Sequence, residues 1–188
     1  TGTRGISQMT TASVFWFTGL SGVGKSTIAE AAKSQLELMR LKVLVLDGDN
    51  VRSKIHQNLG FSESDIVENN RLISELCIKH RQEYDIILVP IISPFRRSRS
   101  AAKKNLGKGF YEIYLDADIK TLFKRDTKGL YKQARNGLID NLIGVSKSIR
   151  YEPPKNPDLR LDTANSSIED SISTFIKFIE SKSFISTN

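Results

Sequence analysis

The sequence predicts an α/β fold in three layers, with a central, mostly parallel sheet flanked by helices and a lid segment. Short runs of β-branched and aromatic residues alternate with longer segments whose apolar residues recur at helical spacing, as expected when helices connect parallel strands. The first strand, residues 14–18, leads into a glycine-rich run that ends in Gly24, Lys25 and Ser26, and an amphipathic segment follows. Strand, glycine loop and helix in this order form a phosphate-binding P-loop. The fold is therefore predicted to be of the P-loop NTPase type.

The remaining elements follow from local patterns in chain order. Residues 43–46 are all aliphatic and predict a second strand, and the apolar run at 86–92 predicts a strand buried on both faces. Ser62, followed by the acidic Glu63 and Asp65, is typical of a helix start. The expected strands are residues 14–18, 43–46, 86–92, 110–115 and 159–162, and the expected helices are residues 28–39, 51–57, 62–83, 97–105, 119–124 and 168–179.

The chain of 188 residues is long enough for one domain with a full core, which we place at residues 13–182. Residues 1–12 are expected to be a disordered leader or tag remnant, and residues 183–188 a tail. Residues 126–157 contain glycines and prolines but no clear helical or strand period. A long irregular segment beside a phosphate site is typical of a lid, so a lid is predicted here.

Composition limits the compartment and the partners that we expect for the protein. No apolar run approaches the ~20 residues that span a bilayer, so we expect no membrane partner. Cys77 is the single cysteine and lies among aliphatic residues, which predicts a buried thiol and a reducing, cytoplasmic compartment. The net charge of +7 permits nucleic-acid binding, but it also suits an enzyme that gathers two polyanionic nucleotides. The basic run at 96–104 lacks aromatics that stack on bases, so nucleic acid is the minor alternative.

Each position of the glycine-rich run has a physical role in binding a nucleoside triphosphate. Glycines let backbone N–H groups converge on phosphate oxygens with no Cβ in the way. Lys25 supplies a positive charge for the β- and γ-phosphates, and Ser26 offers a hydroxyl to Mg²⁺. The alternative, a Gly/Ser turn that happens to precede a lysine, is disfavoured by the flanking strand and helix. The predicted nucleotide-binding residues of this run are Gly19, Ser21, Gly22, Gly24, Lys25, Ser26 and Thr27.

The carboxylates indicate which kind of P-loop protein this is. A GTP-binding switch needs an Asn-Lys-x-Asp sequence to read the base, and the chain has none. Motor and transporter ATPases carry a carboxylate at the end of an apolar strand, whereas the strand at 86–92 leads only to proline and serine. Asp47 and Asp49 instead follow the second strand, which together with a basic lid favours a small-molecule kinase. The competing interpretation is that Asp-Gly-Asp forms a turn and a helix cap.

The chain also carries six short blocks, at residues 19–27, 46–52, 58–62, 92–96, 125–132 and 151–154. Their sequences, order and spacing resemble those of adenylylsulfate (APS) kinases. Members of that family transfer the γ-phosphate of ATP to the ribose 3′-hydroxyl of APS and so form PAPS, the sulfate donor. The resemblance thus implies a nucleotide 3′-kinase that uses ATP and Mg²⁺, and it also implies a homodimer.

On the donor side the resemblance implies three catalytic residues, Lys25, Asp47 and Asp49. The two aspartates orient the 3′-hydroxyl, accept its proton or hold the metal through water, because phosphoryl transfer needs positioning and charge neutralisation more than covalent chemistry. Ser26 and Asp47 are the implied metal ligands, and Arg125 belongs to the lid over ATP.

On the acceptor side the resemblance implies that Arg52 grips the 5′-phosphate group and that Phe61 stacks on the base. Without the resemblance, an isolated phenylalanine is more often a core residue. The other implied substrate contacts are Asn69, Ile92, Ser93 and Leu142, together with Lys128, which belongs with Arg125 to the lid over ATP.

The chain departs from the family pattern around the acceptor. Ile66 stands where the family usually has an arginine that contacts the acceptor's anionic group, and Leu142 stands where a second aromatic completes a base sandwich. Such losses cost on the order of 2 kcal/mol for the arginine and roughly 1–3 kcal/mol for the aromatic. Two acceptors therefore stay open: APS itself, or another nucleotide with a modified 5′-phosphate, such as cytidine diphosphoramidate in capsule modification. Outside the enzyme class, the alternative is a non-catalytic nucleotide-binding module, against which the intact Lys25 and Asp47 argue.

Overall fold

Five parallel strands form one sheet across the described part of the chain, in the order β2-β3-β1-β4-β5. The computed structural model describes residues 11–54, 58–126, 128–136, 142–143 and 149–182. The predicted parallel sheet with flanking helices is confirmed. The strands are β1 (Ser13–Thr18), β2 (Val43–Val45), β3 (Ile86–Val89), β4 (Phe110–Asp116) and β5 (Leu159–Asp162), and the helices are α1 (Lys25–Leu38), α2 (Gly48–Lys54), α3 (Glu63–His80), α4 (Arg96–Leu106), α5 (Ile119–Arg125), α6 (Leu130–Arg135) and α7 (Ile168–Lys182).

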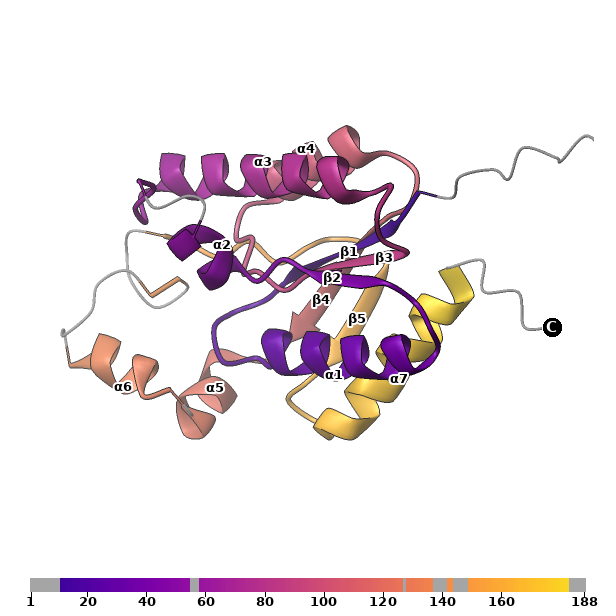
Figure 1. Cartoon of the computed structure of the whole chain (residues 1–188). Helices are drawn as coiled ribbons and strands as arrows, with labels where there is room; N and C mark the ends of the chain where they lie inside the picture. The colour runs from indigo at the N-terminus through magenta and orange to yellow at the C-terminus, as the bar shows by residue number, and fades with distance from the viewer. Residues whose placement is uncertain (1–10, 55–57, 127, 137–141, 144–148, 183–188) are drawn as a thin grey trace, which may run out of the picture.

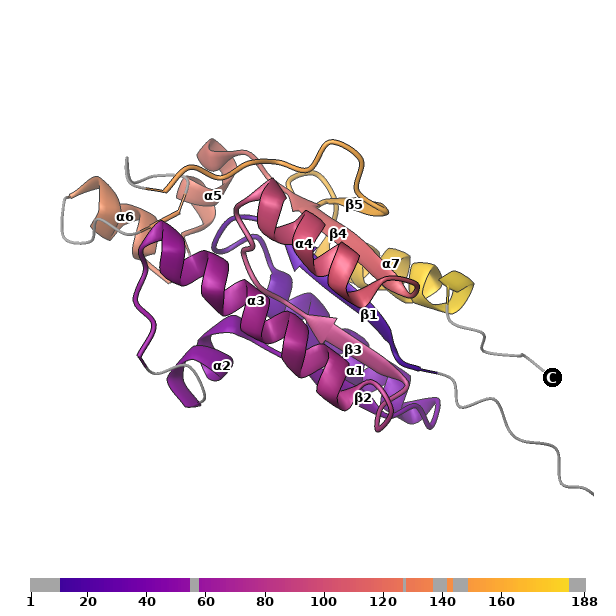
Figure 2. The ribbon, with the colours of Figure 1, turned by 90° about the horizontal axis from the view of Figure 1, so that it is seen from above.

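Helices cover both faces of the sheet, with α1 and α7 side by side on one face and α3 and α4 on the other (Figure 1, Figure 2). The central strand β1 serves both layers because successive side chains of a strand point to opposite faces. The rings of Phe15 and Phe17 lie 5.8 and 5.1 Å from that of Phe175 in α7. Val14 and Trp16 belong to a second apolar cluster, which lies on the other face of the sheet and includes residues of α3 and α4. The alternation along β1 thus produces two cores from one strand.

Cys77 of α3 lies fully buried in this second cluster, as its apolar neighbours predicted. Burial raises the pKa of its thiol to about 12, so the thiol stays protonated at neutral pH. Within the described ranges, no helix combines the length and the apolarity needed to cross a membrane.

Ala12, which the sequence placed in the leader, belongs to the folded domain. It is buried, its N–H donates to the carbonyl of Arg81 and its carbonyl accepts from Arg81 Nε, both at 2.9 Å. The rest of the expected leader, residues 1–10, and the expected tail, residues 183–188, lie outside the described residues.

The segment predicted as an irregular lid contains a helix and a stretch that is bonded to the body of the domain. The helix is α6, whose six residues are too few to reveal a helical period in the sequence. Farther along, the hydroxyl of Tyr151 shares a hydrogen bond of 2.9 Å with Thr18 Oγ1 of β1. The N–H of Glu152 donates to the carbonyl of Pro94 in the loop after β3. A lid role therefore suits the part that carries α6, and not the part around Tyr151.

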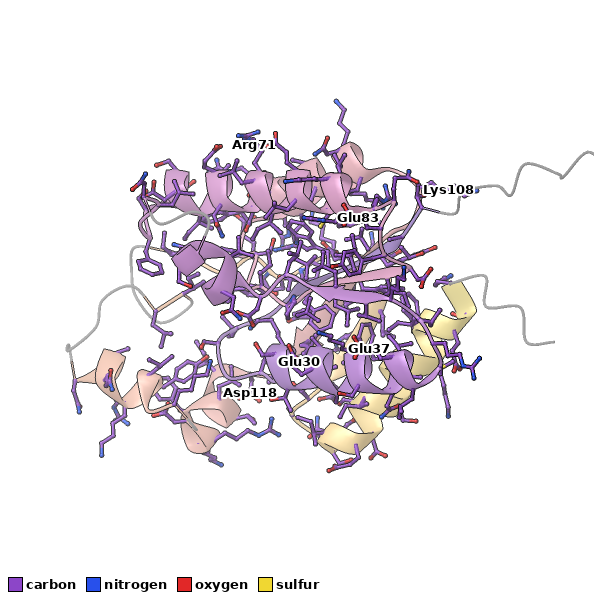
Figure 3. All side chains as sticks on the ribbon, viewed as in Figure 1. Glu30, Glu37, Arg71, Glu83, Lys108 and Asp118 are labelled. Atoms are coloured by element: carbon purple, nitrogen blue, oxygen red, sulfur yellow. The ribbon has the colours of Figure 1, made fainter. Side chains whose placement is uncertain are left out.

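Charged side chains lie mainly on the outer faces of the helices, as α3 illustrates. Arg71 points away from the sheet (Figure 3) and donates to Glu68 and Glu75, the acidic residues one turn before and one turn after it. Such exposed pairs each contribute less than about 1 kcal/mol. The position of α3 is instead determined by its buried stripe, which includes Ile73 and Cys77.

Arg99 of α4 is the buried exception among the basic residues of that helix, with 2% of its surface exposed. Its guanidinium donates to Glu112 Oε2 of β4 at 3.0 Å and to the backbone carbonyls of Ser93 and Glu152 at 2.6 Å. Burial raises the pKa of the Glu112 carboxyl, and the adjacent guanidinium opposes that shift. One side chain thus joins α4, β4 and two loops.

Replacing Arg99 by alanine is expected to destabilise the domain by about 3–5 kcal/mol, because the largely buried Glu112 carboxylate then loses its hydrogen-bonded counter-charge and keeps the weaker attraction of Lys103. Arg97→Ala in the same helix is the matched control: its ion pair with Glu63 is exposed, so its loss should cost less than about 1 kcal/mol. Urea unfolding at neutral pH measures both. A carboxyl whose pKa is raised by folding costs stability once ionised, so the deficit of Arg99→Ala should shrink as the pH falls and Glu112 takes up a proton. Equal deficits in the two variants would contradict this account.

Candidate active site

A cleft of about 740 Å³ opens at the carboxyl ends of the strands, where ligands bind in parallel α/β sheets. The turn between β1 and α1, helix α2 and helices α5 and α6 all lie at this end of the molecule (Figure 1). The cleft brings together most of the residues that the sequence assigned to the site. These are Ser21, Gly22, Gly24, Lys25, Ser26, Thr27, Asp47, Arg52, Phe61, Asn69, Ile92, Arg125, Lys128 and Leu142.

The P-loop runs from β1 into α1 in a conformation that depends on its glycines. Gly24, immediately before α1, has a φ of 102°, which L-residues with a side chain rarely adopt. Gly19 is constrained by space: a Cβ there would lie 2.8 Å from the carbonyl oxygen of Leu115 in β4. Gly19 is accordingly buried beneath the cleft and does not line it.

Lys25, the first residue of α1, is buried under the loop that precedes it. Its ammonium donates to the carbonyl oxygens of Gly19 at 2.9 Å and Leu20 at 2.7 Å. The backbone of the loop therefore folds around the Lys25 ammonium. A phosphate that enters offers this ammonium a charged acceptor in place of neutral carbonyls, and hydrogen bonds between opposite charges are the stronger kind.

Ser26 and Asp47 connect the start of α1 to the loop between β2 and α2. Ser26 Oγ donates to Asp47 Oδ2 at 2.8 Å. Both side chains offer oxygen, the ligand type that Mg²⁺ prefers, and Mg²⁺ commonly takes one or two protein ligands beside phosphates and water. The described residues contain no cluster of three or more metal-binding side chains, so this pair fits Mg²⁺ only together with a bound phosphate. Asp49 lies in α2, but its side chain is outside the described part of the chain.

The opposite wall of the cleft carries Arg52 of α2 and Phe61. The Arg52 guanidinium carbon lies 4.5 Å from the centroid of the Phe61 ring, and Nη1 donates to the carbonyl of Gly60. A cation over an aromatic face contributes about 0.5–1 kcal/mol at an exposed site. Phe61 keeps 54% of its surface exposed, so the core interpretation of this phenylalanine is wrong. Its ring is available to a ligand.

The two residues at which the chain departs from the family pattern, Ile66 and Leu142, both line the cleft. Ile66 of α3 is also buried in a third apolar cluster, with Phe95, Ile143 and Ile149. The wall is therefore apolar where the family pattern would have placed an arginine.

Ser93, an implied substrate contact, does not line the cleft. It is buried at a φ of 46°, and its hydroxyl accepts from the indole N–H of Trp16 at 3.0 Å and from the amide of Asn70 at 3.3 Å. Its carbonyl accepts from Arg99. Ser93 thus supports the loop that carries Ile92 and orients Asn70, which does line the cleft.

The sequence analysis missed several residues of the cleft. Asn70 follows Asn69 on α3, and both are buried on the stripe that Ile66 and Ile73 define at helical spacing. Two amides on an otherwise apolar stripe are a signal that could have identified them. The cleft also takes in Thr163, Ser166, Ser167, Ile168 and Ser171, at and before the start of α7, for which no motif gave a signal.

Two cations approach the cleft from the segment that carries α5 and α6. Arg125 ends α5, and its Nη2 donates to the carbonyl of Ala164 at 3.2 Å. Lys128 is exposed just before α6. Together with Lys25 and Arg52 they give the cleft a positive lining, which suits phosphate groups.

Comparison with known proteins agrees with this arrangement. Residues 11–162 match the family model described as adenylylsulphate kinase. The chain belongs to the adenylylsulphate kinase family. Adenylyl-sulfate kinases of Halothermothrix orenii and Marinobacter nauticus are 43% and 40% identical to this kinase, over 90% and 93% of its chain and 90% and 87% of theirs. A solved APS kinase of Mycobacterium tuberculosis in complex with AMPPNP and APS has a TM-score of 0.84 and 38% identity, with 90% of this chain and 98% of that chain covered.

Membership of the family confirms the resemblance and the enzyme class: this kinase is an ATP-dependent phosphotransferase. The alternative acceptor, cytidine diphosphoramidate, finds no support among these relatives, whose names specify adenylyl sulfate. Family membership establishes the reaction class, and the roles of the individual side chains are proposals.

Lys25→Ala is expected to weaken ATP binding roughly 10- to 100-fold and to lower kcat by about 100-fold or more, because the transferred phosphate loses its nearest cation. Lys33 of the same helix, whose ammonium pairs with Glu37, is the matched control, and Lys33→Ala should change neither value. Calorimetric titration with a non-hydrolysable ATP analogue and an ADP-release assay measure the two effects. Nucleotide binding by Lys25→Ala at the wild-type level would show that this ammonium does not hold the phosphates.

Proposed function

We propose that this kinase transfers the γ-phosphate of ATP to the ribose 3′-hydroxyl of APS, forming PAPS and ADP. One observation carries the proposal: a single cleft holds the P-loop and its carboxylate partner on one side and the Arg52–Phe61 pair on the other. Two nucleotides in such a cleft would meet near Asp47. The likeness to a solved APS kinase that binds AMPPNP and APS supports the same division between donor and acceptor.

On the donor side, the P-loop holds ATP. Lys25 and the backbone N–H groups of the loop and the first turn of α1 bind the β- and γ-phosphates, aided by the positive end of the helix dipole. Arg125 and Lys128 cover the nucleotide from the lid segment. Ser26 and Asp47 are the ligands for Mg²⁺, which when bound neutralises charge on the phosphates.

On the acceptor side, carboxylates act on the hydroxyl that attacks. A carboxylate can accept about four hydrogen bonds, so Asp47, which accepts from the Ser26 hydroxyl, can also accept one from a substrate hydroxyl. Asp47 and Asp49 orient the 3′-hydroxyl, and one of the two carboxylates receives its proton as its oxygen bonds to the γ-phosphorus and the bond to ADP breaks. Arg52 holds the 5′-phosphosulfate and Phe61 stacks on adenine, with Asn69, Ile92 and Leu142 completing the wall.

Two further parts of the proposal, a homodimer and a cytoplasmic location, have separate grounds. The homodimer follows from the family resemblance. The location follows from Cys77, the one cysteine of the chain, which is buried and has no internal partner for a disulfide.

An ADP-release assay over a panel of acceptors tests the proposed substrate. We expect turnover with APS, and no comparable turnover with 5′-AMP, CDP or cytidine diphosphoramidate. Phosphorus NMR of the product should place the new phosphate on the 3′-oxygen. Preference for a cytidine nucleotide would overturn the acceptor, whereas ATP binding without turnover of any acceptor would favour a non-catalytic nucleotide-binding module.

Arg52→Ala is expected to raise the KM for APS roughly 10- to 100-fold and to leave the Kd of ATP unchanged, because a bidentate contact with an anion is lost. Arg52→Lys keeps the charge but not the planar group over Phe61, so it should recover only part of the affinity. Arg71→Ala, on the outer face of α3 (Figure 3), is the control and should change neither value. Equal losses for both substrates would mean that Arg52 supports α2 and does not bind the acceptor.

A further inference from the structure

Tyr131 of α6 is buried and contacts the P-loop. It is 2% exposed, and it is not among the residues that line the cleft. Its hydroxyl donates to the carbonyl oxygen of Ser21 at 2.5 Å. Its ring packs on the next residue, since a Cβ built on Gly22 would lie 3.7 Å from Tyr131 Cε2. Tyr131 therefore fixes the peptide unit between Ser21 and Gly22.

That peptide unit is trans, so its carbonyl and its N–H point in opposite directions. Because the Ser21 carbonyl turns toward Tyr131, the Gly22 N–H turns the other way, toward the cleft that Gly22 lines. We propose that Tyr131 is a positioning residue, which holds the Gly22 N–H in the direction of the phosphates of ATP. The inference rests on the proposed binding of ATP by this loop.

The segment around α6 keeps Tyr131 in place through local contacts. The carboxylate of Asp126 accepts from the backbone N–H of Tyr131 at 3.1 Å and of Lys132 at 3.0 Å, and so caps the first turn of the helix. The Tyr131 ring lies 5.1 Å from that of Phe123 in α5. Burial raises the pKa of the Tyr131 hydroxyl to about 12, so it remains a donor throughout the neutral pH range.

The contact also joins two parts of the donor site. Arg125 and Lys128 precede Tyr131 in the same segment and line the cleft. A bond from this segment to the P-loop therefore sets the position of both cations relative to the phosphate-binding N–H groups. The acceptor wall comes mainly from α2, α3 and the loop after β3. Leu142 of that wall shares an apolar cluster with the Tyr131 ring, so a change that removes the hydroxyl and keeps the ring leaves the wall packed. Loss of the Tyr131 hydroxyl should thus weaken the binding of ATP and leave the binding of APS unchanged.

Tyr131→Phe removes the hydroxyl and keeps the ring. We expect the Kd of MgADP and of inorganic tripolyphosphate, and the KM for ATP, to rise about three- to tenfold, as for the loss of one hydrogen bond. The KM for APS should not change, and Tm should fall by no more than about 4 °C. Tyr114→Phe is the matched control, because that hydroxyl also donates a hydrogen bond, but to Asp116 Oδ1 of its own strand β4 at 3.0 Å and not to the P-loop.

Amide NMR provides a readout that a purely structural role would not move. In the wild type, tripolyphosphate should shift the Gly22 amide resonance strongly. In Tyr131→Phe the shift at saturation should be smaller, because the peptide unit is no longer held with its N–H toward the phosphates. In Tyr114→Phe it should equal the wild-type shift.

The results of these experiments test the role of Tyr131 and the proposed function separately. Unchanged binding of tripolyphosphate and an unchanged Gly22 shift in Tyr131→Phe overturn the inference and leave the proposed function intact. A parallel loss of ATP and APS affinity with a large fall in Tm also overturns it, since Tyr131 would then be a core residue alone. A wild-type enzyme that binds tripolyphosphate but does not phosphorylate APS refutes the proposed acceptor, while the binding comparison still decides the role of Tyr131.

Discussion

A loop that presents its N–H groups to phosphate must have its carbonyl groups bonded elsewhere, because each peptide unit carries both. This requirement organises the donor half of the molecule. Four carbonyls of the P-loop accept hydrogen bonds from Lys25, from the backbone of the loop and of the helix that follows it, and from the tyrosine of α6. Within the described ranges, no acceptor faces the N–H of Gly22 or Gly24. The accepting carbonyls are those of Gly19 and Leu20, bonded to Lys25, Ser21, bonded to Tyr131, and Gly24, bonded to Ile28.

The acceptor half is attached to the same frame through the last residue of β1. Thr18 Oγ1 donates to the carbonyl of Ile92 at 2.9 Å, and the Gly19 N–H donates to that carbonyl as well. The loop that presents Ile92 to the acceptor is thus bonded to the residue that begins the P-loop. Arg99 and Tyr151 reinforce this joint from the other side. Phosphoryl transfer requires the attacking and leaving oxygens to be in line, so under the proposed function this joint serves to align the two substrates.

The sequence predicted what local patterns and motifs encode, and it missed what single long-range contacts create. The Ser26–Asp47 pair was foreseeable, since both residues lie in motifs next to predicted strand ends. The third strand was predicted too long because the apolar run continues past Val89, whereas Pro90 cannot extend the ladder and the following side chains line the cleft. Tyr131 bonds to a residue 110 positions away, and such a contact leaves no period in the sequence. Its role could be inferred only from the folded chain.

The acceptor wall differs from the donor side of the cleft in how much positive charge it carries. Apart from Lys25 and the cations of the α5–α6 segment, Arg52 is the cation that the described residues bring to the cleft. Ile66 stands in place of the family's arginine and packs with Phe95 in an apolar cluster, so this part of the wall is apolar. Attraction between charges strengthens as the local dielectric constant falls. The guanidinium of Arg52 is also held in advance by the Phe61 ring and the Gly60 carbonyl, which lowers the entropy lost on binding. Under the proposed function, one pre-oriented arginine beside an apolar wall is therefore expected to carry much of the acceptor recognition, which ties that recognition to the geometry of Arg52.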